Sequence, residues 1–193
     1  MPDRPTQILE AAARLIARRG VRGLRVEEVS AEAGVSTALI YYHFKDRAGL
    51  LRRTLEFISR RAVRYTDAAL EASDDPRTQL TEMLLLELQD TPHVRENSAA
   101  WGELRATTVF DPDLRELLAA ATREWIDDLA HLIRQAKAQA VDTVDRPGRE
   151  TDPYDAAERL TALVEGLSER WLSGTTSLQR AHELLRGAIE AEL

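Results

Sequence analysis

Hydrophobic residues recur at helical spacing along almost the whole chain. Apolar positions three and four residues apart predict amphipathic helices. The segments with this spacing are residues 6–19, 26–33, 36–44, 46–72, 77–90, 93–110, 111–140, 153–173 and 178–192. No alternating strand pattern, internal repeat or low-complexity tract lies between them. The chain is therefore predicted to be all-α, with about nine helices.

Short polar stretches separate these helices. Ser-Asp-Asp-Pro-Arg at residues 73–77 is the clearest break, and residues 142–152 form a polar loop. Between Gly49 and Ala72 there is no Pro or Gly, so the segment 46–72 is predicted to be one stiff helix. It would link the N-terminal part of the chain to the rest, so that a tilt at one end moves the other.

The segments 26–33 and 36–44 predict a helix-turn-helix. Gly34 stands where the chain must turn through a left-handed conformation, which glycine adopts at low cost. Ser36 is placed to cap the second helix. Ile40 and Phe44 form the inner face of that helix. Two helices joined by such a turn are typical of proteins that insert the second helix into the major groove of DNA.

The outer face of the second helix suits DNA as well. It carries Thr37, Ala38, Tyr41, Tyr42 and His43. Small residues at the helix start allow close approach to base edges, and hydroxyl and ring N–H groups can bind phosphate oxygens. Lys45 and Arg47 follow as predicted phosphate contacts. The alternative is an ordinary helical hairpin with an aromatic surface patch.

The charge of the chain is divided unevenly. The net charge is −7, but residues 1–64 carry 13 Lys and Arg against 7 Asp and Glu, whereas the remainder carries 13 against 26. This division suggests a basic nucleic-acid module joined to an acidic one. An uneven charge is common in other proteins, so it supports the motif without replacing it.

The composition argues against an enzyme. There is no Cys, and His43, His93, His131 and His182 are far apart and lack helical metal-site spacing. No phosphate-binding glycine loop or nucleophile elbow is present, so we expect no catalytic site, no metal and no cofactor. No apolar run approaches the ~20 residues that a membrane helix needs, and no signal peptide is evident. A cytoplasmic protein is the simplest interpretation.

Several N-terminal motifs resemble the TetR family of transcriptional regulators. They are Ile-Leu-Glu-Ala-Ala-Ala at 8–13, Arg-Arg-Gly at 18–20, Glu-Ala-Gly-Val-Ser at 32–36, Leu-Ile-Tyr-Tyr-His-Phe at 39–44 and Asp-Arg-Ala-Gly-Leu-Leu at 46–51. Arg25 departs from the family, which usually has a capping Thr or Ser there, and Ser30 replaces a common Ala. Arg25 can reach a phosphate but cannot cap the helix.

The resemblance implies a DNA-binding domain at residues 1–50 and a helical effector-binding and dimerisation domain at 51–193. In the family the first helix lies with its N-terminus near the DNA backbone. The predicted DNA-binding residues are Arg4, Thr6, Arg25, Ser36, Thr37, Ala38, Tyr41, Tyr42, His43, Lys45 and Arg47.

The C-terminal part resembles the betaine-regulator subgroup more loosely. The motifs are Trp-Gly-Glu-Leu-Arg at 101–105, Asp-Pro-Asp-Leu-Arg at 111–115 and Glu-Gly-Leu at 165–167. The resemblance implies a pocket for a small effector of unknown identity. Its candidate lining residues are Glu87, Trp101, Arg105, Trp125, His131 and Trp171; for each, the alternative is a core or helix-edge role.

The family pairs its last two helices across a dimer. The candidate interface residues are Leu160, Val164, Leu167, Trp171, Leu178, Leu185 and Ile189. The alternative is that both helices simply cover the core of a single chain. In the family such a homodimer binds a palindromic operator, acts most often as a repressor and is released by its effector. The remaining rival is a helical protein–protein adaptor, which would leave the basic N-terminus and its exposed tyrosines unexplained.

Overall fold

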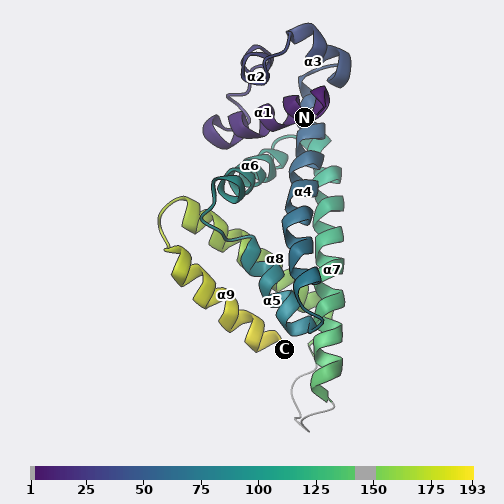
Figure 1. The fold of residues 1–193 in the computed structure, drawn as a ribbon, viewed down its shortest axis with the longest axis vertical. Coiled ribbons are helices and arrows are strands. Elements are labelled where there is room, and N and C mark those ends of the chain that lie inside the picture. Colours follow the sequence, from purple (N-terminus) through teal and green to yellow (C-terminus); the bar gives the residue numbers. More distant parts are fainter. Residues whose placement is uncertain (1–2, 142–150) are drawn as a thin grey trace. The chain divides into compact units, whose positions relative to one another are not determined.

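The structure, a computed structural model, describes residues 3–141 and 151–193 of the chain. Within these residues it is all-helical. The helices are α1 (Arg4–Arg19), α2 (Val26–Ala33), α3 (Thr37–Phe44), α4 (Arg47–Ala72), α5 (Pro76–Leu86), α6 (Pro92–Thr108), the 3₁₀ turn η1 (Pro112–Leu114), α7 (Arg115–Val141), α8 (Pro153–Leu172) and α9 (Leu178–Glu192) (Figure 1). The predicted all-α class is confirmed, and residues 142–150 of the predicted polar loop lie outside the described residues.

One difference from the predicted boundaries is at the end of α5. The segment was predicted to be helical to residue 90, but α5 ends at Leu86. The side-chain amide of Gln89 donates a 2.8 Å hydrogen bond to the carbonyl oxygen of Leu86. This bond satisfies one of the carbonyls that a helix end leaves without an intrahelical partner.

Packing divides the chain into two compact units, which we describe separately. Unit 1 contains residues up to Ala62 together with Arg95–Ala121. Its core joins α1, α2, α3 and the first half of α4 to Ala100 and Leu104 of α6 and to Leu114. Residues 95–121 therefore share one core with the DNA-binding domain predicted at 1–50, although they belong to the other predicted domain. The division at residue 50 stays a functional prediction.

Unit 2 contains Val63–Val94 and Thr122–Leu193. Its core is formed by α5, α8, α9 and the second half of α7, with Leu84, Leu129 and Leu160 among its most buried residues. Helix α7 serves both units: Leu117 and Leu118 pack against the first core, and Ile126 onwards belongs to the second. A single apolar stripe in the sequence therefore supplies two separate cores.

Candidate nucleic-acid interface

The turn between α2 and α3 has the geometry expected of a helix-turn-helix. Gly34 is left-handed, with φ 64° and ψ 38°. The amide of Val35 donates a 3.0 Å hydrogen bond to the carbonyl of Ser30, which closes the end of α2. A β-carbon at Gly34 would meet nothing within 4 Å, so glycine is needed here for its backbone conformation and not for space.

The recognition helix α3 has one buried and one exposed face, as predicted. Ile40 and Phe44 are 1% and 5% exposed, whereas Tyr41 and Tyr42 are 47% and 80% exposed. Ser36 caps the helix by accepting a 3.2 Å hydrogen bond from the amide of Leu39. In Figure 1, α2 and α3 lie at one end of unit 1, with α1 beside them.

The outer face of α3 presents polar and aromatic groups together. Thr37 is half-buried, and Ala38 and His43 are exposed. The rings of Tyr42 and His43 meet edge to face, with centroids 5.1 Å apart. This exposed face offers hydroxyl and imidazole groups to a partner, together with a small side chain near the helix start.

The start of α2 lacks a side-chain cap, as the sequence predicted. Arg25 occupies the N-cap position and its side chain makes no capping hydrogen bond. The buried Ser30 directs its hydroxyl to the carbonyl of Glu27, 2.9 Å away, instead of to another element. The two departures from the family pattern therefore leave the start of α2 without a side-chain cap.

The N-terminus of α1 lies near the end of α3. Asp3 caps α1 by accepting a 2.9 Å hydrogen bond from the amide of Thr6. Hydrogen bonds from Thr6 lower the pKa of the Asp3 carboxyl, and the charge of His43 adds to this effect. Arg4 follows directly and donates to the side-chain oxygen of Gln7, 3.0 Å away. Arg4 and Thr6 thus come from the helix end that is close to the outer face of α3.

Carboxylates neutralise some of the basic residues within residues 1–50, which we call the head. Arg14 and Arg18 pair with Glu32, at 2.9 and 3.2 Å, and Arg19 pairs with Glu28 at 3.0 Å. The hydrogen bond from Arg14 lowers the pKa of the Glu32 carboxyl. Those three arginines are therefore largely compensated within the head.

Two other cations are exposed without such a partner. Within the described part of the chain, the side chains of Arg25 and Lys45 make no ion pair or hydrogen bond. Both lie beside the helix-turn-helix, Arg25 before α2 and Lys45 after α3. Their positive charge is therefore available beside the helix-turn-helix.

Arg47 has a different environment. Its Nε donates a 3.1 Å hydrogen bond to the carbonyl of Leu24, and its Nη2 donates to the carbonyl of Val21 at 2.6 Å. The guanidinium thus holds the connector between α1 and α2 against the start of α4. Sequence reasoning placed Arg47 among the phosphate contacts and missed these main-chain bonds.

Known proteins share this arrangement. Residues 8–54 match the family of bacterial regulatory proteins of the TetR type, and residues 76–193 match the C-terminal family of BetI-type transcriptional repressors. The chain belongs to the TetR family of transcriptional regulators. It is thus a transcriptional regulator and not an enzyme, as the sequence predicted.

Individual TetR-family proteins are similar over nearly the whole chain. A regulator from Rhodococcus sp. is 47% identical, with a TM-score of 0.87, and the match covers 99% of this chain and 98% of that one. A transcriptional regulator from Saccharomonospora viridis, solved in complex with choline, is 30% identical, with a TM-score of 0.83 and coverage of 96% and 95%. The HTH-type regulator BetI of Brucella melitensis is 26% identical over 90% of this chain and 82% of its own.

The six predicted effector residues occupy different environments. Trp101 and Arg105 belong to α6 in unit 1, where Trp101 is half-buried against the core. In unit 2, Trp125 is half-buried against the core and Glu87 is half-buried at the end of α5. Trp171 is only 6% exposed within the core, and His131 is exposed. Trp171 therefore fits the core alternative, and its role as an effector residue stays a prediction.

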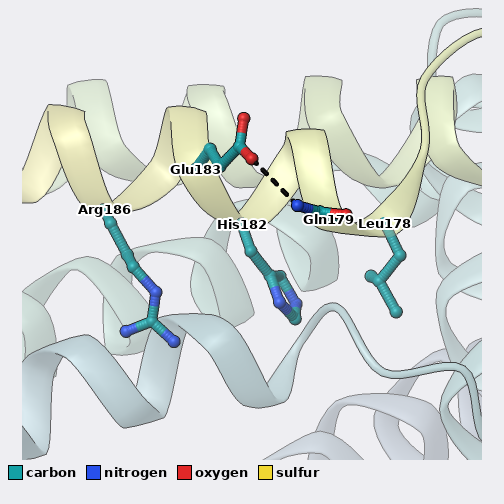
Figure 2. A pocket seen from close by; sticks show the side chains of 5 residues that line it. All are labelled: Leu178, Gln179, His182, Glu183 and Arg186. Carbon is teal, nitrogen blue, oxygen red and sulfur yellow. Dashed lines mark hydrogen bonds between the residues drawn. The ribbon is translucent and has the colours of Figure 1, made fainter.

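A hollow on the surface of unit 2 runs along α9. It is lined by Leu178, Gln179, His182, Glu183 and Arg186 (Figure 2). Leu178, His182 and Arg186 point to the same side of the helix, and a ring nitrogen of His182 lies 2.6 Å from the carbonyl oxygen of Leu88. None of the six predicted effector residues lines this hollow.

Most of the predicted dimer residues lie in the core of a single chain. Leu160, Val164, Leu167, Trp171, Leu185 and Ile189 are each 6% exposed or less. Side chains so buried have almost no surface left to give to a partner, so their apolar stripe is accounted for by unit 2 itself. Leu178 is half-buried and keeps surface.

No cluster of His, Asp and Glu suited to a metal ion occurs among the described residues. No helix in the described ranges is long and apolar enough to cross a membrane.

Proposed function

We propose that this regulator binds a near-palindromic operator as a homodimer, represses transcription there, and is released by a small cationic effector. The observation that carries the proposal is the outer face of α3, where 80% of Tyr42 and 47% of Tyr41 are exposed on a short, capped helix. Apolar ring surface of this size rarely stays exposed on so short a helix without a binding role. A protein acting on chromosomal DNA in this way works in the cytoplasm.

The DNA contacts divide into reading and anchoring. Thr37, Ala38 and Tyr41 lie toward the helix start, which enters the major groove in helix-turn-helix proteins. Tyr42, His43, Lys45, Arg25 and Ser36, with Arg4 and Thr6 of α1, would contact the phosphate backbone. Phosphate contacts position the protein, whereas base contacts specify the sequence.

A dimer would use the outward surfaces of α8 and α9. Gly166 and Gly187 lie within these continuous helices, and among the described residues a β-carbon at either would meet nothing within 4 Å. Each glycine costs a helix about 1 kcal/mol relative to Ala, and no described atom outside its own helix packs close enough to need it. Close approach by a helix of a second copy would explain both, and the 38%-exposed Leu184 lies beside Gly187 on α9.

The effector is proposed to be choline or a related quaternary ammonium compound. This rests on the likeness to the regulator from Saccharomonospora viridis, solved in complex with choline. Quaternary ammonium ions bind over aromatic faces, most strongly over Trp. In unit 2, Trp125 is half-buried and keeps part of its surface for a ligand; Trp101 of unit 1 is likewise half-buried and is a separate candidate. Glu87, one of the predicted lining residues, would supply a carboxylate to such a cation.

DNA binding is tested with a random-sequence duplex at increasing salt. With about 6–10 phosphate contacts, affinity should fall by ~10³–10⁵ between 50 and 200 mM salt. Affinity that stays nearly flat over this range would contradict the proposal. Binding-site selection then tests reading: Thr37→Gln should change the selected consensus, whereas Arg18→Ala, a cation paired with Glu32, should not.

Effector binding is tested by calorimetric titration with choline chloride. Its neutral carbon isostere, dimethylbutanol, has the same shape without the charge and serves as the matched control. Choline should bind, the isostere should not, and choline should weaken operator binding by the same factor by which operator weakens choline. Equal binding of both compounds would exclude a cation site, while leaving the DNA-binding proposal intact.

A further inference from the structure

The turn between α3 and α4 contains a backbone conformation that lysine rarely adopts. Lys45 has φ 68° and ψ −55°, and it is the one non-glycine residue with positive φ among the described residues. The amide of Asp46 donates a 2.8 Å hydrogen bond to the carbonyl of Phe44. A hydrogen bond between residues two apart, around a centre with these angles, defines the rare and strained form of the γ-turn.

Neighbouring atoms fix this turn from both sides. Phe44 is anchored in the core at 5% exposure. On the other side, the amide of Gly49 donates a 2.6 Å hydrogen bond to Oδ1 of Asp46. A β-carbon at Gly49 would lie 2.1 Å from the carbonyl oxygen of Phe44, so α4 approaches the end of α3 as closely as the backbone allows. The backbone of Lys45 is therefore held in one conformation.

Glycine would adopt this conformation at lower cost than lysine. The side chain of Lys45 is exposed, and within the described residues no carboxylate pairs with it. Strained backbone residues concentrate at functional sites, where the surrounding structure maintains them. A glycine at this position would lack the positive charge that lysine supplies at the end of the recognition helix.

The second cation of the turn has two of its donor atoms directed to main-chain carbonyls. Arg47 uses Nε and Nη2 to bind the carbonyls of Leu24 and Val21. These two bonds connect the start of α4 to the connector that leads into α2. Lysine cannot donate to two carbonyls in this fork geometry, so arginine is required at position 47 for both bonds.

We propose that these two cations have separate roles. Lys45 is a phosphate contact whose position is set by the strained γ-turn. Arg47 is a positioning residue that holds the connector, and with it α2, at a fixed place relative to the start of α4. This inference rests on the proposed DNA binding. It assigns the phosphate contact at this turn to Lys45 and not to Arg47.

The test compares three variants with the wild-type protein. For each, we would measure the slope of log affinity against log salt on a random-sequence duplex, and the melting temperature. Lys45→Ala should reduce the slope by about 0.9, the value for one phosphate contact on duplex DNA, without raising the melting temperature. Lys45→Gly should reduce the slope equally and raise the melting temperature, because glycine relieves the strain. Arg47→Ala should lower the melting temperature and leave the slope unchanged.

Further measurements separate the possible failures. If Arg47→Ala does not fold, Arg47→Lys replaces it, with the same expected loss of stability at an unchanged slope. A wild-type slope retained by Lys45→Ala, or a slope lowered by about one unit in the Arg47 variant, would overturn the assignment. A melting temperature no higher in Lys45→Gly than in Lys45→Ala would overturn the strain argument. A wild-type protein that binds no duplex at low salt would refute the proposed function itself.

Discussion

Arg61 of α4 donates a 2.7 Å hydrogen bond from Nε to Oδ1 of Asn97 on α6, and the two residues are 5% and 2% exposed. The same guanidinium pairs with Glu96 at 3.0 Å through Nη1, and its carbon lies 5.6 Å from the centre of the Phe57 ring. A buried charge is tolerated only where it is paired and hydrogen-bonded. This cluster therefore attaches α6 to α4 within unit 1.

Removing one partner of this cluster should be far more damaging than removing the neighbouring exposed cation. Asn97→Ala leaves the buried Nε of Arg61 without its acceptor and should destabilise the protein by about 1–3 kcal/mol. Arg61→Ala should cost about 3–5 kcal/mol, because it leaves Glu96 without its buried partner. Arg60→Ala is the matched control, since Arg60 is exposed and should change stability by less than about 0.5 kcal/mol. Urea unfolding measures all three, and equal values for Arg60 and Arg61 would contradict the role of the cluster.

The missing cap of α2 gives a second prediction, in the stabilising direction. Arg25→Ser supplies the side-chain oxygen that this helix start lacks and should stabilise the protein by about 1 kcal/mol. Ser36→Ala removes the existing cap of α3 and should cost about the same. Arg25→Ser should also weaken duplex binding, because it removes an exposed cation. Thermal unfolding of the two variants would show shifts of opposite sign; a destabilised Arg25→Ser would show that the arginine stabilises α2 in another way.

The helix-turn-helix could be predicted from the sequence because its determinants are local. Gly34, Ser36 and the spacing of Ile40 and Phe44 act within a few residues of one another, and the structure confirms each. The caps and the two-faced α3 needed no knowledge of distant segments.

The assignment of buried surfaces needed more than periodicity. Helical spacing shows that Leu160 and Leu185 face something apolar, but not whether that surface is their own core or a second chain. The structure assigns them to the core of unit 2. Arg61 was missed although it follows Thr54 and Ile58 at helical spacing on the buried face of α4, a pattern that would have predicted its burial. Its partners on α6 are too distant in sequence for any spacing rule.

The pair between Arg159 and Glu192 predicts a dependence of stability on pH. Nε and Nη2 of Arg159 each lie 2.7 Å from a carboxylate oxygen of Glu192, joining α8 to the end of α9. The hydrogen bonds from Arg159 lower the pKa of the Glu192 carboxyl below its ordinary value. The stabilisation is therefore present above the unfolded-state pKa of Glu, about 4.3, and is lost as the pH falls through the lower folded-state value.

Glu192→Gln removes the titrating group and tests this directly. The wild-type protein should melt higher than the variant at about pH 7, and the difference should shrink toward about pH 3. Glu190→Gln is the control, because Glu190 is an exposed carboxylate on the same helix whose side chain forms no ion pair among the described residues. A difference between wild-type and Glu192→Gln proteins that stays constant over this range would show that the pair does not contribute through its charge.

The neighbours Leu184 and Leu185 separate dimer formation from folding. Leu185 is fully buried in the core of unit 2, whereas Leu184 is 38% exposed on the next position of α9. Leu185→Glu would bury a charge without a partner and should unfold unit 2. Leu184→Glu and Gly187→Leu change only the outward surface of α9, so each should keep the helical circular dichroism of the wild type and still unfold cooperatively. If that surface forms the dimer, both variants should sediment as monomers and lose affinity for a palindromic operator, while the wild-type protein sediments as a dimer. Arg186→Gln is the matched control and should remain dimeric, because Arg186 points to the same side of α9 as Leu178 and His182, along the hollow in Figure 2. A Leu184→Glu variant that is folded and still dimeric would place the interface elsewhere on the chain.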